Sequence, residues 1–322
     1  MKVGITGVAG FIGSNLADAL LERGHTVIGL DNLSMGSLRN IEQNLGSPNF
    51  RFHQMDVRDL AKMREAFRDA ERIVHLAAFK IPRYGKAIET LEINAEGGKN
   101  VLELGREGNR RVILASTSDI YGKNPSIPFQ ETSDSVLGPT IIPRWSYAVS
   151  KLFEEHLALA YHSSYGVPVT ILRFFGTYGP RQHLSWWGGP QSVFIKAILT
   201  NEPIEIHGDG TQTRSFTYIS DLVDGIVRAT ECDGEPAVFN LGNTVEISVL
   251  DLANLIHRLC GAAAPIQLKM VPYASLGGHY EDVMRRIPDI SRARSILGFE
   301  PKVGLQEGLT KTIQWQKIAM GL

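Results

Sequence analysis

The first half of the chain alternates short apolar runs with longer stretches in which apolar residues recur at helical spacing. Such runs indicate strands buried on both faces, and such stretches indicate helices with one apolar face. The predicted strands are Lys2–Thr6, Thr26–Leu30, Arg51–Met55, Arg72–Leu76, Arg111–Ala115 and Pro168–Leu172, and the predicted helices are Phe11–Arg23, Asp59–Asp69, Ile88–Glu107 and Trp145–Tyr165. This alternation predicts an α/β fold with a Rossmann-type doubly wound parallel sheet.

The pattern becomes less regular after Arg173. Residues 180–190 are rich in Gly, Pro and aromatic side chains, and further helices are predicted at Ser192–Leu199, Asp221–Thr230, Val249–Leu259, Ile290–Leu297 and Leu305–Lys317. We therefore predict a Rossmann domain over residues 1–175, with a return segment near 215–260. Residues 176–322 would form most of a smaller α/β substrate-binding lobe. No low-complexity linker separates the two parts, so we expect them to be rigidly joined around a cleft.

Composition narrows the class of protein. The chain has 322 residues and a net charge of −1, which favours neither nucleic acid nor an anionic membrane as a partner. Its two cysteines, Cys232 and Cys260, are too few for a disulfide framework and indicate a reducing compartment. The sequence opens on a predicted strand without a basic, apolar leader. We expect a cytoplasmic protein without a metal site.

Three glycines, Gly7, Gly10 and Gly13, lie between the first predicted strand and the first predicted helix. Glycines let the backbone turn tightly and approach a pyrophosphate, and the helix N-terminus supplies N–H donors. Asp31, at the end of the second strand, is placed to bond the adenosine ribose and to repel a 2′-phosphate, which favours NAD over NADP. A plain strand-to-helix turn is the alternative interpretation of the glycines alone.

Tyr147 and Lys151 lie four residues apart on one predicted helix, so both side chains leave the same face. A lysine ammonium beside a phenol is expected to lower the pKa of that phenol. The tyrosinate could then take a proton from a substrate hydroxyl. The spacing alone fits an ordinary amphipathic helix equally well.

Hydroxyl residues ending in a carboxylate, Ser116 to Asp119, follow the apolar strand at Val112–Ala115. Ligands of open α/β sheets bind at this carboxyl edge. We expect Thr117 to contact substrate, while Asp119 either supplies an acid or base or caps a polar turn.

Several longer motifs make the chain recognisable. They are Gly7–Gly13, Asp56-Val57, Leu76-Ala77-Ala78, the Thr117 segment, Tyr147-Ala-Val-Ser-Lys151, Arg173-Phe-Phe-Gly-Thr-Tyr-Gly-Pro-Arg181, Gly208-Asp-Gly-Thr-Gln-Thr-Arg214, Arg286-Ile-Pro-Asp289 and Leu297-Gly-Phe-Glu-Pro301. With these, the chain resembles the extended short-chain dehydrogenase/reductase family of NAD-dependent sugar-nucleotide epimerases, dehydratases and decarboxylases. The resemblance runs nearly end to end.

The resemblance implies roles for individual residues. Thr117, Asp119, Tyr147 and Lys151 would be catalytic. The implied cofactor contacts are Gly7, Gly10, Phe11, Ile12, Gly13, Asp31, Asn32, Asp56, Val57, Leu76, Ala77, Ala78, Lys80, Asn94, Ser116, Tyr147, Lys151 and Phe174. The implied substrate contacts are Thr117, Ser118, Arg181, Val193, His207, Arg214 and Arg286, with the last two arginines on the substrate diphosphate and His207 near the base. Without the family context, surface ion pairs would explain the arginines.

The resemblance also implies the chemistry: oxidation at sugar C4 to a 4-keto intermediate, with NAD reduced and reoxidised in one turnover. Thr117-Ser118-Asp119, Arg144-Trp145 and the segment Tyr280–Arg286 are similar to those of decarboxylases acting on UDP-glucuronate. We therefore favour UDP-glucuronate decarboxylation, followed by 4-epimerisation of a UDP-sugar and then by 4,6-dehydration.

Other features leave these alternatives open. Asp119 is one methylene shorter than the glutamate of those decarboxylases, and Gly176 replaces the usual asparagine after Arg-x-Phe. The loop from His183 to Pro190 either shapes sugar specificity, acts as a lid or simply packs. A non-catalytic NAD-sensing protein on the same fold is the alternative outside enzymes, against which the retained Thr117, Tyr147 and Lys151 argue.

The resemblance further suggests a homodimer in which the helices at Ile88–Glu107 and Trp145–Tyr165 pair with a second subunit as a four-helix bundle. From sequence alone, the apolar faces of these helices could equally pack inside the monomer.

Overall fold

A computed structural model describes residues 1–80, 87–275 and 281–322. Its main sheet has seven strands in the order β10-β6-β5-β4-β1-β2-β3, and every adjacent pair is parallel. Its strands are β1 (Lys2–Thr6), β2 (Thr26–Asp31), β3 (Phe50–Gln54), β4 (Arg72–His75), β5 (Arg111–Thr117), β6 (Val169–Phe174) and β10 (Ala237–Leu241). The predicted Rossmann-type α/β fold is confirmed.

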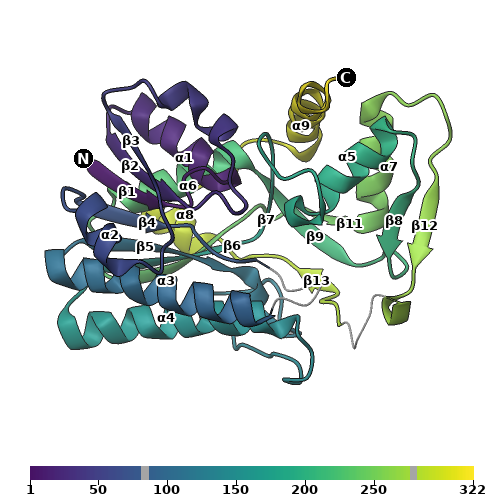
Figure 1. The fold of residues 1–322 in the computed structure, drawn as a ribbon. Coiled ribbons are helices and arrows are strands. Elements are labelled where there is room, and N and C mark those ends of the chain that lie inside the picture. Colours follow the sequence, from purple (N-terminus) through teal and green to yellow (C-terminus); the bar gives the residue numbers. More distant parts are fainter. Residues whose placement is uncertain (81–86, 276–280) are drawn as a thin grey trace.

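Helices cover both faces of this sheet (Figure 1). On one face lie α2 (Leu60–Ala66), α3 (Ala87–Gly108) and α4 (Trp145–Tyr165), and on the other lie α1 (Phe11–Glu22), α6 (Ile219–Glu231) and α8 (Ser291–Leu297). Each face has its own apolar core. Leu16, Leu20 and Ile226 are fully buried on the α1 face, while Val101 and Ala158 are fully buried on the α3–α4 face. Strands such as β1, β2, β5 and β6 are therefore buried along most of their length because both of their faces are covered, whereas the edge strand β3 is partly exposed.

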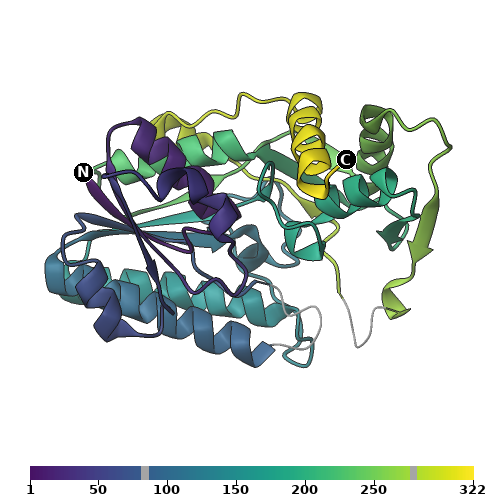
Figure 2. The same cartoon turned by 45° about the horizontal axis from the view of Figure 1, so that its top comes forward.

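Smaller elements pack beside the carboxyl edge of the sheet, seen from a second direction in Figure 2. They comprise β7 (Gly176–Tyr178), β8 (Ile204–His207), β9 (Thr213–Tyr218), β11 (Glu246–Ser248), β12 (Leu268–Val271), β13 (Arg285–Arg286), α5 (Pro190–Leu199), α7 (Val249–Cys260) and α9 (Leu305–Met320). Five short 3₁₀ turns complete the described part: η1 (Leu38–Asn40), η2 (Glu42–Asn44), η3 (Ser118–Tyr121), η4 (Trp186–Gly188) and η5 (Tyr273–Ser275).

The predicted helices of the second half occur within a few residues of their predicted bounds, but its strands were not predicted. These strands are short and only partly buried, so they lack the continuous apolar runs of the main sheet. Within the predicted return segment, α6 lies against α1, and β10 pairs with β6 at the sheet edge. The domain boundary itself stays a prediction.

Candidate active site

A cavity of about 510 Å³ opens at the carboxyl ends of the main strands. Its centre lies where strand order reverses between β1 and β4, the place at which doubly wound sheets bind ligands. The predicted site residues that line it are Gly7, Gly10, Phe11, Ile12, Asp31, Asn32, Val57, Leu76, Ala77, Ala78, Lys80, Ser116, Thr117, Ser118, Asp119, Tyr147, Phe174, His207, Arg214 and Arg286. The structure therefore brings together residues from widely separated parts of the sequence.

The glycine loop has the geometry that a dinucleotide requires. Gly7 has a φ of +74°, and a Cβ atom there would lie 2.9 Å from the backbone nitrogen of Ala77. At Gly13 a Cβ atom would lie 2.1 Å from the carbonyl oxygen of Gly7, so this glycine lets α1 pack directly on the loop. The backbone of Gly7 and Gly10 and the first residues of α1, Phe11 and Ile12, thus form this part of the cavity wall, with no side chain on the two glycines. These residues fit a bound pyrophosphate.

Asp31 closes the other end of the loop. One carboxylate oxygen accepts the Ala9 N–H at 3.0 Å and the other accepts the Leu33 N–H at 2.8 Å. Burial raises the pKa of Asp31, and these two backbone donors partly offset that rise. Contact of this carboxylate with the adenosine ribose stays a prediction.

Two predicted cofactor residues have protein partners instead. Asp56 accepts hydrogen bonds from Arg58 at 2.9 Å and from Asn32 at 3.1 Å, and the Arg58 contact is the main reason that its pKa falls to about 2. Asn94, fully buried on α3, accepts the Phe79 N–H at 2.7 Å and donates to Ser150 at 2.9 Å. Asn94 thus ties the segment after β4 to α4, and its direct contact with the cofactor stays a prediction.

Two predicted substrate residues also lie against other protein groups. Arg181 forms an ion pair with Asp18 of α1 at 2.7 Å. Val193, on α5, packs against the apolar core. His207 lies in the cavity wall with Trp186 stacked on it, ring centroids 4.7 Å apart. Direct contact of Arg181 and Val193 with a sugar nucleotide stays a prediction.

The loop from His183 to Pro190 lines the cavity and is held by aromatic contacts. Besides Trp186 on His207, Trp187 meets Phe79 edge-on with ring centroids 5.3 Å apart. The Lys80 ammonium reaches the Trp187 carbonyl at 3.4 Å. The loop therefore packs across the cavity onto the segment that follows β4.

Gly176, where the family resemblance led us to expect asparagine, also lines the cavity. A Cβ atom at this position would lie 2.9 Å from the Phe216 ring and from the Ser215 carbonyl oxygen. The neighbouring strand β9 thus fills the space that a larger side chain would need.

Thr117 and Tyr147 share a hydrogen bond at the cavity wall. Thr117 comes from the end of β5, and its hydroxyl donates its one proton to Asp119 at 3.1 Å. Tyr147 comes from the first turn of α4. Burial, then the negative charges of Asp119 and Glu154, raise the pKa of Tyr147. The sequence had predicted a lowered pKa, and the structure corrects this.

A smaller contribution to the raised pKa of Tyr147 comes from the partner of Lys151. Its ammonium contacts the Glu154 carboxylate at 3.1 Å, and both side chains are buried. Glu154 therefore compensates the positive charge of Lys151, so the Tyr147 phenol does not face an isolated ammonium group.

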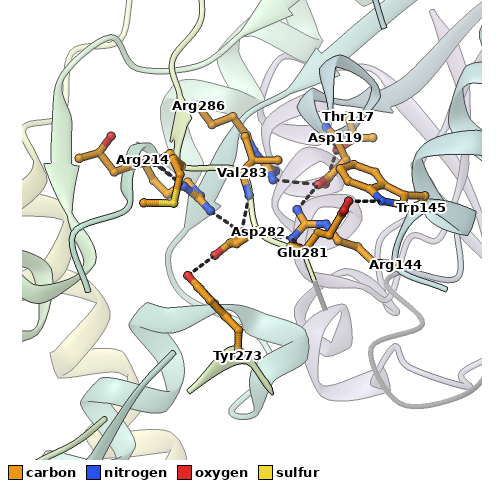
Figure 3. Close-up of polar contacts among 12 residues, drawn as sticks. Thr117, Asp119, Arg144, Trp145, Arg214, Tyr273, Glu281, Asp282, Val283 and Arg286 are labelled. Carbon is orange, nitrogen blue, oxygen red and sulfur yellow. Dashed lines mark hydrogen bonds and ion pairs between the residues drawn. The ribbon is translucent and has the colours of Figure 1, made fainter. Parts of the chain in front are cut away.

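Arginines gather around Asp119, as the close-up in Figure 3 shows. Arg286 contacts the Asp119 carboxylate at 2.9 Å and Arg144 contacts it at 3.6 Å. Burial by itself would raise the pKa of Asp119, but the two guanidinium groups outweigh burial and hold that pKa well below its usual range. Asp119 is therefore a permanent carboxylate near neutral pH. It cannot donate a proton there, which excludes the acid role among those predicted for it.

Asp282 is a site residue that the sequence analysis missed. Its carboxylate accepts from Arg214 at 2.9 Å and from Arg144 at 3.2 Å, and from the Tyr273 hydroxyl at 3.1 Å (Figure 3). Arg214 on β9 lies opposite Arg286 on β13 in the strand register, so the two arginines are held side by side. The sequence did contain a signal for Asp282, since this acid comes three residues before the consecutive arginines Arg285 and Arg286. Tyr280, quoted in the same segment, lies outside the described residues.

A second buried network supports β5 and β6 behind the site. The Glu155 carboxylate bonds Arg173 at 2.7 Å, and Arg173 also donates to the Tyr121 hydroxyl at 2.9 Å. Arg173 is therefore paired on both sides of its guanidinium group.

Replacing Glu155 by Ala leaves the Arg173 charge buried without its partner. We expect a loss of about 3–5 kcal/mol in the free energy of unfolding. Urea unfolding measures it, with exposed Glu202→Ala as the control; equal stability of both variants would contradict this assignment.

The described residues hold no group of His, Cys, Asp and Glu arranged to bind a metal ion. Among their helices, none has the length and apolar character needed to cross a membrane.

The fold, the glycine loop and the cavity at the sheet edge are those of a nucleotide-binding α/β enzyme. The family model described as GDP-mannose 4,6 dehydratase matches residues 5–312, and the chain belongs to this family. The resemblance to sugar-nucleotide-modifying extended short-chain dehydrogenases/reductases is thereby confirmed.

Individual relatives span the whole chain. The chain is 38% identical to a UDP-N-acetyl-alpha-D-glucosaminuronate decarboxylase of Bacillus cytotoxicus, covering 97% of this chain and 96% of the relative. It is also 38% identical to UDP-glucuronic acid decarboxylase 1 of Xenopus tropicalis, covering 98% of this chain and 72% of the relative. A UDP-glucuronic acid 4-epimerase of Bacillus cereus, solved with UDP-glucuronic acid and NAD, superposes with a TM-score of 0.88 at 32% identity, covering 99% and 100% of the two chains.

Proposed function

We propose that this protein uses NAD to oxidise C4 of a UDP-linked uronic acid and then releases the C5 carboxylate as carbon dioxide. The observation that carries the proposal is the meeting of Arg286 and Arg144 at Asp119, beside Thr117 and Tyr147. Guanidinium groups suit carboxylates, and a neutral hydroxymethyl group would not require them. The two decarboxylases described above support the same assignment.

The cofactor would lie along the glycine loop, with its pyrophosphate over Gly7 and Gly10 and its ribose near Asp31. NAD, when bound, accepts a hydride from the sugar and later returns one. The negative Asp31 disfavours the additional phosphate of NADP.

The chain's own residues would handle the protons and the carboxylate. Tyr147 takes the proton of the C4 hydroxyl, and Thr117 orients that hydroxyl through the hydrogen bond that it shares with Tyr147. Arg286 and Arg144 hold the C5 carboxylate next to the reacting carbon, so that Arg286 serves here in place of the diphosphate contact predicted for it, which is left to Arg214. Once C4 is a ketone, the substrate is a β-keto acid. Its C5–carboxylate bond can break with the electron pair delocalised onto the C4 oxygen.

Epimerisation at C4 with the carboxylate retained is the second candidate. It is favoured by the close superposition on the Bacillus cereus epimerase. It requires only the Thr117–Tyr147 pair and room for the 4-keto sugar to turn before the hydride returns.

Incubation with UDP-glucuronate, UDP-N-acetylglucosaminuronate, UDP-glucose and UDP-N-acetylglucosamine tests both candidates. Products are identified by NMR, and evolved carbon dioxide is measured. A UDP-pentose or its acetamido analogue with stoichiometric gas supports decarboxylation. C4 epimers of a uronate without gas support the second candidate, and no change in any sugar nucleotide overturns both.

The outer surfaces of α3 and α4 support a homodimer. Val149 (45%), Phe153 (50%) and Tyr165 (62%) of α4, together with Ile88 (62%) of α3, expose large fractions of their apolar side chains. The two helices pack side by side, so a second copy could complete a four-helix bundle. Light scattering of wild type and Phe153→Asp tests this: a dimer that becomes monomeric is expected, and a monomeric wild type would contradict it.

A further inference from the structure

Lys151 and Glu154 form a pair that is closed off from solvent on α4. The Lys151 side chain is 2% exposed and the Glu154 side chain 0%, and Nζ lies 3.1 Å from Oε2. The other carboxylate oxygen of Glu154, Oε1, is buried without a hydrogen-bond partner among the described residues. A buried, incompletely bonded carboxylate costs free energy, so its presence beside Lys151 calls for a role.

The neighbouring helix is shaped to admit this carboxylate. Gly98 of α3 faces Glu154, and a Cβ atom at Gly98 would lie 2.9 Å from the Glu154 Cγ. Any other residue at Gly98 would crowd the side chain. Both the acid and the space for it are therefore built into the α3–α4 contact.

The other charged groups around the pair already have partners. From α4, Glu155 is bonded to Arg173 of β6. From β4, His75 bonds Thr6 of β1 at 2.7 Å, and burial, followed by the charge of Lys151, lowers its pKa to about 3, so it stays neutral. From η3, Asp119 is held by Arg286 and Arg144. From α3, the nearby Asn94 carries no charge. Glu154 is therefore the acid that compensates Lys151 within the described structure.

We propose that Glu154 is a positioning residue that, by compensating the charge of Lys151, raises the pH at which Tyr147 gives up its proton. The inference rests on the proposed function, in which Tyr147 is the base at C4. Tyr147 and Lys151 lie one helical turn apart, and Glu154 follows Lys151 by less than one turn. The electrostatic effect on the Tyr147 phenol is then that of the Lys151–Glu154 pair as a whole, and not that of the lysine ammonium alone.

The pH dependence of turnover follows from this arrangement. Burial raises the pKa of Glu154 to about 7, although the charge of Lys151 opposes that rise. Near neutral pH, therefore, the carboxylate gains its charge as pH increases and opposes the ionisation of Tyr147 over the same range.

The kinetic test is the pH profile of kcat in Glu154→Gln. Gln keeps the shape and an oxygen acceptor for Lys151 but removes the negative charge. We expect the rise of kcat with pH to move down by about one unit, with KM for the sugar nucleotide unchanged. Glu154→Asp keeps the charge and should retain the wild-type profile. If the Gln variant does not fold, Glu154→Met removes the same charge with a similar volume.

A second measurement needs no turnover. With NAD present, tyrosinate absorbance is titrated in wild type and in Glu154→Gln, and the curve of the matching Tyr147→Phe protein is subtracted from each. Tyr147 should titrate at lower pH in Glu154→Gln. If no sugar nucleotide is converted, the proposed function fails, yet this titration still decides the role of Glu154.

Two results would overturn the inference. One is a uniform fall in kcat at every pH with an unmoved profile, which indicates a structural role alone. The other is a Tyr147 titration that is unchanged, or moves to higher pH, in Glu154→Gln.

Discussion

Replacing Tyr147 by Phe is expected to lower kcat by about 10²–10⁴-fold, the usual contribution of a positioned general base. The phenol hydroxyl lines the cavity and bonds Thr117, so its removal deletes the proton acceptor while leaving the ring that packs there. Steady-state assays on the converted sugar nucleotide measure the loss. Calorimetric titration with NAD should show that binding is retained, because the glycine loop and Asp31 are unchanged in this variant.

Tyr165→Phe is the matched control, because Tyr165 is on the same helix but is 62% exposed. It should retain wild-type kcat. A Tyr147→Phe protein with more than a tenth of wild-type activity would show that another group takes the proton.

Asp119→Asn should lower carbon dioxide release by roughly 10²-fold, with C4 oxidation largely retained. The carboxylate fixes Arg286 at 2.9 Å, and its negative charge opposes that of the substrate carboxylate. The repulsion between Asp119 and the substrate carboxylate is relieved as the carboxylate becomes neutral carbon dioxide. Asp119 therefore destabilises the bound substrate more than it destabilises the transition state. The amide keeps the size of the side chain but loses both effects.

The measurement combines gas evolution with NMR of the sugar products, in which 4-keto or C4-epimeric species should accumulate. Asp134→Asn, at an exposed carboxylate, is the control. Undiminished gas release from Asp119→Asn would mean that the carboxylate serves only to support the local structure.

Six of the seven main strands were predicted because short runs rich in apolar residues alternate with amphipathic helices, whereas β10 was not predicted. The predicted helix Trp145–Tyr165 has those bounds in the structure. By contrast, β7, β9 and β13 were not predicted. They are short and partly polar, and what makes them strands is pairing with distant segments, such as Arg286 opposite Arg214. Such pairing depends on tertiary contacts that no local pattern records.

The candidate site was predictable where chemistry follows a motif, as at Gly7 and Tyr147. The ionisation states of the site residues were not predictable from the sequence. Whether Lys151 acts freely on Tyr147 depends on Glu154, and the ionisation of Asp119 depends on Arg286, which comes from the other end of the chain. Burial and the surrounding charges raise the pKa of Tyr147, and the spacing of Tyr147 and Lys151 records neither, so it gave the wrong direction for this pKa.

The late arrival of β10 has a consequence for how the protein is made. This strand pairs with β6, whose Ile171 and Leu172 are fully buried. Between β6 and β10 in the sequence, the ribosome synthesises β7, α5, β8, β9 and α6. Until the ribosome has passed Leu241, β6 is an open, apolar sheet edge of the kind that associates with other chains. The nascent chain therefore carries its greatest aggregation hazard midway through synthesis. The pairing of β10 with β6 both covers this edge and completes the sheet, and it joins segments that are far apart in the sequence.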